Sequence, residues 1–151
     1  MRFVLDASVV VAWAFADEEH PVAAAALALI RNDEGFVPSL WWFEVRNVLI
    51  VNERRGRLRE TDTALFLRNL ARLPIIVDRV PEEASVLTLA RRHGLTVYDA
   101  SYLELAERHA APLATLDMAL AQAAQRENIS LIGDGTPMTR SALHPDLNEP
   151  A

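Results

Sequence analysis

The stretch RFVLDAS, residues 2–8, places an aspartate directly after a short apolar run. Phe3, Val4 and Leu5 are typical of a buried strand, and Asp6 would then stand at the carboxyl end of that strand. The rest of the chain continues as an alternation of short apolar runs and longer helical patterns. This alternation predicts an α/β fold, in which a parallel sheet is flanked by helices on both faces.

The individual elements follow from the apolar runs and the residues that bound them. We predict strands at about 2–5, 36–38, 75–77, 113–116 and 130–132, and helices at about 8–16, 21–31, 40–55, 61–73, 81–93, 99–109 and 117–126. Ser8 and Ser39 are the expected N-caps of the first and third helices. We assign residues 1–133 to a single domain, and residues 134–151, where glycine and proline punctuate a polar sequence, to a C-terminal tail.

The composition excludes several classes of protein. The chain has 151 residues, of which 51% are apolar, so it can bury the core of one domain, yet no stretch approaches the roughly 20 apolar residues of a membrane span. It contains no cysteine, and all fifteen basic residues are arginine. Disulfides, zinc–thiolate sites and cysteine nucleophiles are therefore excluded, as are P-loop and Schiff-base enzymes, which need lysine.

The charge and the N-terminus bear on location and partners. The net charge of −6 argues against a protein that coats nucleic acid through its overall field, but not against an enzyme that cuts nucleic acid in a pocket. The first residues loosely imitate a signal peptide, but Asp6 interrupts the apolar run near its start, so we interpret them as core. The absence of cysteine is compatible with the cytoplasm, where we expect the protein to act.

Three more acidic residues stand where an apolar segment ends or a helix begins. They are Glu44 in LWWFEVRN, Asp99 in TVYDAS and Asp117 in LATLDMAL. The carboxyl ends of parallel strands are where such sheets bind ligands. Carboxylates brought together there, Asp6 included, repel one another unless a cation lies between them. A site made only of oxygens indicates magnesium or manganese.

A simpler interpretation is that the aspartates cap helices. Aspartate is a good N-cap, and Asp6, Asp99 and Asp117 all satisfy that description taken singly. Glu44 does not, because it lies inside a strongly apolar helical pattern. Asn47 lies one turn further on and could form a hydrogen bond with Glu44 from the same face. Polar groups on an apolar face are poorly placed without partners, which favours a site over a set of caps.

Two hydroxyl residues accompany the aspartates. Ser8 and Thr115 each stand two residues from an aspartate, and their hydroxyls could orient a carboxylate, a water or a phosphate. The simpler alternatives are that Ser8 caps a helix and that Thr115 favours a strand. The sequence leaves both interpretations open.

The ordered set of motifs resembles the PIN-domain ribonucleases, and specifically the VapC-type toxins of VapBC toxin–antitoxin pairs. The matching motifs are DAS at 6–8, EVRNVL at 44–49, YDA at 98–100 followed by Tyr102 and Leu103, and TLD at 115–117. They span residues 3 to about 132. The resemblance implies a PIN-like, doubly wound parallel sheet and an endoribonuclease that depends on Mg²⁺ or Mn²⁺. It also implies a homodimer that a cognate antitoxin protein inhibits.

The resemblance also implies roles for individual residues. Asp6, Glu44, Asp99 and Asp117 carry over as the catalytic site. Asp6, Asp99 and Asp117 are the expected metal ligands, and Glu44 would ligate the metal or orient water beside it. Ser8, Asn47 and Thr115 are the expected supporting residues. The sequence leaves open whether one metal ion or two are bound.

Alternative functions remain to be weighed. A metal-dependent phosphatase with Asp6 as nucleophile commonly needs an aspartate at the position of Ser8 and a lysine, and the chain has neither. A phospho-accepting receiver domain needs a lysine and a paired acid near the end of the first strand, and the chain has neither. A catalytically silent PIN-like binding module is the alternative without catalysis.

The arginines and tryptophans raise separate questions. The arginines of residues 46–59 would contact RNA or an antitoxin. Alternatively, they would simply be solvated cations near the C-terminal end of a helix, a position that suits positive charge. Trp41 and Trp42 point to different faces of one helix, so one of them is expected to meet a partner.

Overall fold

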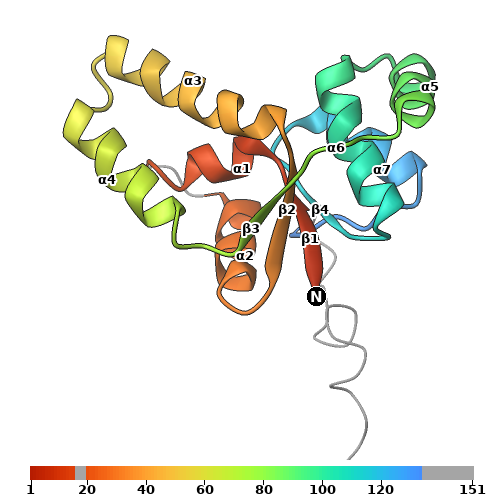
Figure 1. The fold of residues 1–151 in the computed structure, drawn as a ribbon, viewed down its shortest axis with the longest axis horizontal. Helices are drawn as coiled ribbons and strands as arrows, with labels where there is room; N and C mark the ends of the chain where they lie inside the picture. The colour runs from red at the N-terminus through yellow and green to blue at the C-terminus, as the bar shows by residue number, and fades with distance from the viewer. Residues whose placement is uncertain (16–19, 134–151) are drawn as a thin grey trace, which may run out of the picture.

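The structure is a computed structural model, and it describes residues 1–15 and 20–133. Four parallel strands form one sheet: β1 (Arg2–Leu5), β2 (Glu34–Pro38), β3 (Ile75–Asp78) and β4 (Leu113–Ala114), in the order β3-β2-β1-β4 (Figure 1). The predicted α/β fold with a parallel sheet is confirmed. Ala16, the expected end of the first helix, and the predicted tail at 134–151 lie outside the described residues.

Helices cover both sides of the sheet. They are α1 (Ala7–Ala12), α2 (Pro21–Ile30), α3 (Leu40–Arg54), α4 (Glu60–Leu70), α5 (Glu83–His93), α6 (Val97–Arg108) and α7 (Met118–Arg126). Helix α6 packs on β1, β2 and β4 and also contacts α5 and α7, whereas α1 contacts α2 and α3 on the other side (Figure 1). Within the described ranges, no helix combines the length and the apolarity that crossing a membrane requires.

The order in which the strands are added reverses next to β1. The chain adds β2 and then β3 on one side of β1 and returns to add β4 on the other side. Open parallel sheets bind ligands at the carboxyl ends of the strands where the order reverses in this way. Leu5 is the last residue of β1 and pairs with Ala114, and the Asp6 N–H donates to the Ala114 carbonyl at 3.0 Å. Asp6 and Thr115 are therefore the first residues beyond the paired strands at this edge.

One of the two predicted serine caps is wrong. Asp6, not Ser8, occupies the N-cap position of α1, and its extended backbone leads directly from β1 into the helix. Ser39 occupies the N-cap position of α3 as predicted, but its backbone is already helical and its side chain makes no capping hydrogen bond. In both cases the chain enters the helix straight from a strand end, so the local serine preference does not decide how the helix begins.

Other boundaries shift for identifiable reasons. Helix α5 begins at Glu83 rather than at Pro81, because the Glu82 carboxylate caps it by accepting from the Ser85 N–H. Strand β4 ends at Ala114, because the backbone N–H groups of Leu116 and Asp117 donate to side-chain hydroxyls instead of to a strand. The strand expected at 130–132 is reduced to one bridge between Leu131 and Leu113.

The predicted end of α5 agrees with the structure. Gly94 follows the basic residues of the last turn and adopts φ +63, a left-handed conformation that glycine accepts without strain.

Candidate active site

Asp6 lies directly after β1, beside the carboxyl end of β4. Its side chain is buried, and two hydroxyls donate to the same oxygen, Oδ2: Ser8 Oγ at 2.6 Å and Thr115 Oγ1 at 2.8 Å. Among the described residues, no hydrogen bond reaches Oδ1. One carboxylate oxygen is therefore held by the protein, and the other is available to a ligand.

Each of these hydroxyls is oriented by a backbone donor. The Leu116 N–H donates to Ser8 Oγ, and the Asp117 N–H donates to Thr115 Oγ1, both at 3.0 Å. A hydroxyl carries a single proton, so a hydroxyl that accepts from the backbone can direct that proton at the carboxylate. Ser8 and Thr115 thus stabilise the ionised form of Asp6 and connect the start of α1 to the loop after β4. Ser8 does not cap α1.

Glu44 is held by a residue from the opposite side of the sheet. The Tyr102 hydroxyl donates to Glu44 Oε1 at 2.5 Å, and Tyr102 of α6 is completely buried. The expected partner, Asn47, is exposed, and within the described part of the chain no hydrogen bond joins it to Glu44. That expectation is wrong, because three residues along a helix turn the side chain by about 60° from the first, here far enough to face solvent.

Asp99 and Asp117 belong to the first turns of two helices. Thr96, not Asp99, caps α6, and its hydroxyl accepts from the Asp99 N–H at 3.1 Å, so the capping explanation for Asp99 is wrong. Asp117 does cap α7, with Oδ1 accepting from the Leu120 N–H at 3.0 Å. Its second oxygen is not used by the cap.

The charges of these carboxylates act on one another. Burial raises the pKa of Asp6 most, the hydroxyls of Ser8 and Thr115 lower it, and the charges of Asp99 and Asp117 raise it further. A group shifted by several charged neighbours of the same sign lies in a cluster, as functional sites often do.

Glu44 and Asp99 show the same mutual effect. Burial raises the pKa of Glu44, the Tyr102 hydrogen bond lowers it, and the charges of Asp6 and Asp99 raise it. Burial and then the charge of Asp117 raise the pKa of Asp99, against a hydrogen bond from Thr96. The structure thus brings four carboxylates from four separate segments within reach of one another's charge.

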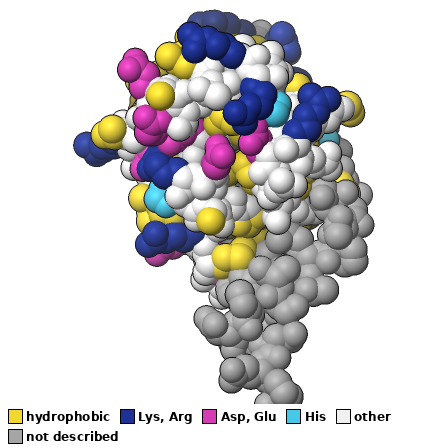
Figure 2. Space-filling view, turned by 90° about the vertical axis from the view of Figure 1, so that its right-hand side faces the viewer, with side chains coloured by type: hydrophobic (Ala, Val, Ile, Leu, Met, Phe, Trp, Pro, Cys, Tyr) yellow, Lys and Arg dark blue, Asp and Glu magenta, His cyan; other side chains and the backbone are white. Residues whose placement is uncertain are grey.

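Several acidic residues elsewhere in the protein are paired with cations. Arg108 binds Asp78, at the end of β3, with an N–O distance of 2.6 Å, and Arg92 binds Glu127 at the same distance. Figure 2 shows acidic, arginine and histidine side chains interleaved on the face that carries α5 and α7. By contrast, across residues 1–15 and 20–133 no arginine or histidine forms an ion pair with any of the four clustered carboxylates.

The cluster has the chemistry of a site for a hard cation. Its donors are all oxygens, which suit Mg²⁺ or Mn²⁺. In the described part of the chain, however, no three acidic or histidine side chains lie close enough together to coordinate one ion directly. One or two carboxylates could therefore hold an ion directly and the others through water, which is the coordination that magnesium prefers.

Comparison with known proteins places the chain in a family. The model of the PIN domain matches residues 3–132, which include all four carboxylates and nearly the whole described structure. This chain belongs to the PIN-domain family.

Individual relatives agree with the PIN-domain assignment. Ribonuclease VapC3 of Pyrobaculum aerophilum is 36% identical over 126 residues, which cover 81% of this chain and 94% of that protein. The crystal structure of PAE2754 from Pyrobaculum aerophilum is similar with a TM-score of 0.65 and 26% identity, over 82% of this chain and 84% of that one. The predicted resemblance to VapC-type PIN-domain ribonucleases is thereby confirmed.

A more distant structure shares the fold. FitAcB from Neisseria gonorrhoeae is similar with a TM-score of 0.54 and 20% identity, over 87% of this chain and 96% of that chain. At this identity the similarity supports the PIN-type fold alone.

Tyr102 has a place in this PIN-domain site that the sequence did not reveal. The residue was part of the motif after Asp99, but nothing local connects it to Glu44, which lies 58 positions away. The available signal was its spacing: Tyr102 follows Asp99 by three residues on one helix, so both side chains lie near one face. A buried tyrosine hydroxyl also needs a partner.

The hydroxyl of Thr115 should contribute to stability. We expect Thr115→Val to lower the free energy of unfolding by about 1–3 kcal/mol, because it removes one of the two hydroxyls that donate to the buried Asp6 carboxylate and leaves the Asp117 N–H without a partner. Thr63→Val is the matched control, since the Thr63 hydroxyl is buried with no hydrogen-bond partner among the described residues and its loss should be neutral or stabilising. Urea denaturation measures both, and equal effects would contradict the role of Thr115.

The raised pKa of Asp99 predicts that its charge destabilises the fold. Stability should fall as the pH rises from the ordinary aspartate range through the raised pKa, because the folded state then loses a proton that it binds more tightly. Asp99→Asn should therefore raise the free energy of unfolding at neutral pH, by only about 0.5 kcal/mol because solvent screens a partly exposed group. Below the pH range in which an ordinary aspartate titrates, the difference in free energy of unfolding between Asp99→Asn and the wild type should vanish. The measurement is urea denaturation with EDTA across pH.

Asp62→Asn provides a control of opposite sign. Hydrogen bonds from the backbone and side chain of Arg59 lower the pKa of Asp62. Its charge therefore stabilises the fold at neutral pH, and Asp62→Asn should lower the free energy of unfolding. If the two variants shift in the same direction, the electrostatic account of the cluster is wrong.

Proposed function

We propose that this protein is a divalent-metal-dependent endoribonuclease that hydrolyses RNA phosphodiester bonds at Asp6, Glu44, Asp99 and Asp117. The observation that supports this most is the cluster itself, in which carboxylates raise one another's pKa with no paired cation. Such a cluster is costly to the fold unless it binds a cation. The identity with a relative named a ribonuclease supports RNA as the substrate.

The carboxylates would have different roles, which depend on which of their oxygens already accept hydrogen bonds. Asp6, Asp99 and Asp117 are the proposed ligands of Mg²⁺ or Mn²⁺, with Asp6 binding through Oδ1. A divalent ion held there would stabilise charge on the phosphate and lower the pKa of the attacking water. Tyr102 uses Oε1 of Glu44, so Oε2 would orient the water or accept its proton, a role that a raised carboxylate pKa favours. Ser8 and Thr115 keep Asp6 in place.

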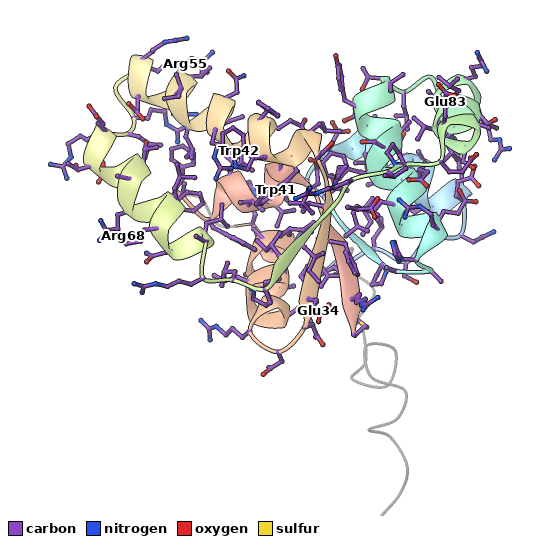
Figure 3. The ribbon with its side chains drawn as sticks, viewed as in Figure 1. Glu34, Trp41, Trp42, Arg55, Arg68 and Glu83 are labelled. Atoms are coloured by element: carbon purple, nitrogen blue, oxygen red, sulfur yellow. The ribbon has the colours of Figure 1, made fainter. Side chains whose placement is uncertain are left out.

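We further propose that the protein is the toxin of a type II toxin–antitoxin pair. It would act in the cytoplasm as a homodimer, under inhibition by a cognate antitoxin protein, and residues 1–133 would form its nuclease domain. The identity with a VapC protein supports this. Trp41 is buried and Trp42 is half exposed, on different sides of α3 as predicted (Figure 3). Trp42 and the exposed Ile50 offer apolar surface to a partner chain.

The arginines that follow Glu44 in the sequence differ in their contacts. Arg57 lies over the Phe15 ring at 4.3 Å, and Arg59 pairs with Asp62, so both have local structural roles. Arg54 and Arg55 are exposed at the far end of α3 (Figure 3). We propose that these two contact phosphates of the RNA, and that exposed Asn47, between them and Glu44, contacts the nucleotide nearer the site.

The central prediction is metal-dependent cutting of RNA. Purified protein should cleave single-stranded or looped RNA with Mg²⁺ or Mn²⁺, and EDTA should stop it. Asp6→Asn and Asp99→Asn should each reduce the cleavage rate by roughly 100-fold or more, since each removes a ligand charge. Glu83→Gln, an exposed acid of α5, is the control and should cut normally (Figure 3).

The outcomes distinguish the alternatives. Normal cutting by both asparagine variants would show that the catalytic residues are wrongly assigned. A folded wild type that cuts no RNA with any divalent ion would favour a binding module. Release of phosphate from simple monoesters without RNA cutting would favour a phosphatase, although Ser8, at the position where such enzymes need an acid, donates to Asp6 instead.

Tyr102 should act through Glu44. Tyr102→Phe removes the donor to Oε1, so the carboxylate loses its fixed orientation, and we expect kcat to fall by about tenfold with KM unchanged. Tyr98→Phe is the matched control, because it makes the same change on an exposed residue of the same helix. Steady-state kinetics on one RNA measure both. An equal loss in the two variants, or a loss confined to KM, would contradict this role.

A further inference from the structure

Large apolar side chains are exposed beside three of the four carboxylates. They are Phe43 at 69%, Tyr98 at 65% and Met118 at 75%, next to Glu44, Asp99 and Asp117 respectively. Among the large apolar side chains of the described residues these are three of the four most exposed, the fourth being Val80 at 78%. Single exposed apolar residues are ordinary on a protein surface, but three that adjoin the acids of one cluster are a recurring feature of the site.

We call Asp6 the floor of the site, and its rim consists of the exposed sequence neighbours of the other three acids, Phe43, Tyr98 and Met118. Asp6 is buried and its own neighbours, Leu5 and Ala7, are buried with it. The other three acids are more exposed, and only they carry exposed apolar neighbours. Because consecutive Cα atoms are about 3.8 Å apart, each of these side chains begins within one residue of a carboxylate.

One part of the rim is already ordered. The Phe43 ring packs edge-on against Trp42, with ring centroids 5.0 Å apart. Arg46 lies over the other aromatic, its guanidinium 4.0 Å from the Trp42 ring, and donates to the Trp42 carbonyl at 3.1 Å. Rings that are fixed before binding lose little conformational freedom when a ligand stacks on them. The arginine adds a positive charge to a surface that is otherwise acidic.

We infer that Phe43, Tyr98 and Met118 hold the unpaired bases on either side of the phosphate that is cut, and so restrict the enzyme to single-stranded or looped RNA. This inference rests on the proposed ribonuclease function. A phosphate at the carboxylates necessarily brings its own nucleotide, base included, to the rim. Aromatic rings stack on any base, and the flexible thioether of Met118 adapts to base faces. Bases inside a duplex are already stacked and cannot reach the rim.

The charge of the site favours bases over other occupants. The acids repel phosphates unless a cation is bound between them, so attraction from groups that carry no charge would add to the phosphate contacts proposed for Arg54 and Arg55. Stacking supplies it without requiring a basic surface. A protein segment seated on the same rim would have to bring cations for the carboxylates, and nothing else about the rim selects such a segment. Binding of a protein chain there is therefore an outcome that the experiment has to detect.

The test combines variants of the rim with changes in the RNA. Tyr98→Leu and Phe43→Leu should each lower kcat/KM by roughly tenfold on a short oligoribonucleotide that the wild type cuts once. Tyr98→Phe keeps the ring and should lose much less activity than Tyr98→Leu. Leu65→Ala, on α4 at 55% exposure and away from the acids, is the second control. The same RNA with an abasic site on one side of the cut should abolish the penalty of one of the two leucine variants.

Equilibrium binding separates this inference from the proposed function. Asp6→Asn protein should bind single-stranded RNA more tightly than duplex RNA of the same sequence, and adding Tyr98→Leu should remove most of that preference. If the wild type cuts RNA but the leucine variants cut and bind as it does, the rim assignment fails and the nuclease stands. If no RNA is cut but binding still depends on the rim, the nuclease fails and the rim stands.

Two further results would overturn the assignment. A leucine variant with the same penalty on intact and abasic RNA would show that the ring does not stack on a base. Variants that cut RNA normally but change the mass of the protein in light scattering would show that the rim is a contact between copies of the chain.

Discussion

The buried carboxylate of Asp6 is the constraint on which the site depends. A buried charge is costly unless hydrogen bonds compensate it. Two hydroxyls supply those bonds, and each is itself fixed by a backbone N–H of the loop after β4. The same network therefore sets the position of Asp6, the entry into α1 and the start of α7. Asp117 is carried on that loop, so the first and the last acid of the site are placed by one set of bonds.

The fold could be predicted because it depends on patterns that lie within short stretches of sequence. Apolar runs of strand length, such as 2–5 and 75–77, alternate with helical patterns, and this decided the α/β class. The errors arose where a distant contact overrode a local preference. Ser8 has the composition of a cap, but its hydroxyl serves residues of the distant β4 loop. Asn47 is near Glu44 in sequence, but Tyr102 reaches Glu44 from 58 residues away.

The protein treats its acidic residues in two ways. Several of those away from the site, such as Asp78 and Glu127, are paired with arginine and help to fix one helix or strand to another. The four acids of the site gain no such partner among the described residues. Burial and mutual repulsion raise the pKa of three of them, so their charges oppose folding at neutral pH. A fold keeps such a cluster when the function needs it, which is the common trade between stability and activity.

An acidic protein that cuts RNA has to solve a problem of attraction. Proteins that hold nucleic acid through phosphates gain affinity by releasing counterions, and they need a basic surface to do so. Here the net charge is −6 and the described face with α5 and α7 mixes both signs, so the overall charge of the protein adds little attraction of that kind beyond the contacts proposed for Arg54 and Arg55. The apolar rim beside the acids offers a different source of affinity, because stacking on bases does not depend on charge. The floor can then remain acidic, as a metal site requires, while the rim selects RNA whose bases are unpaired.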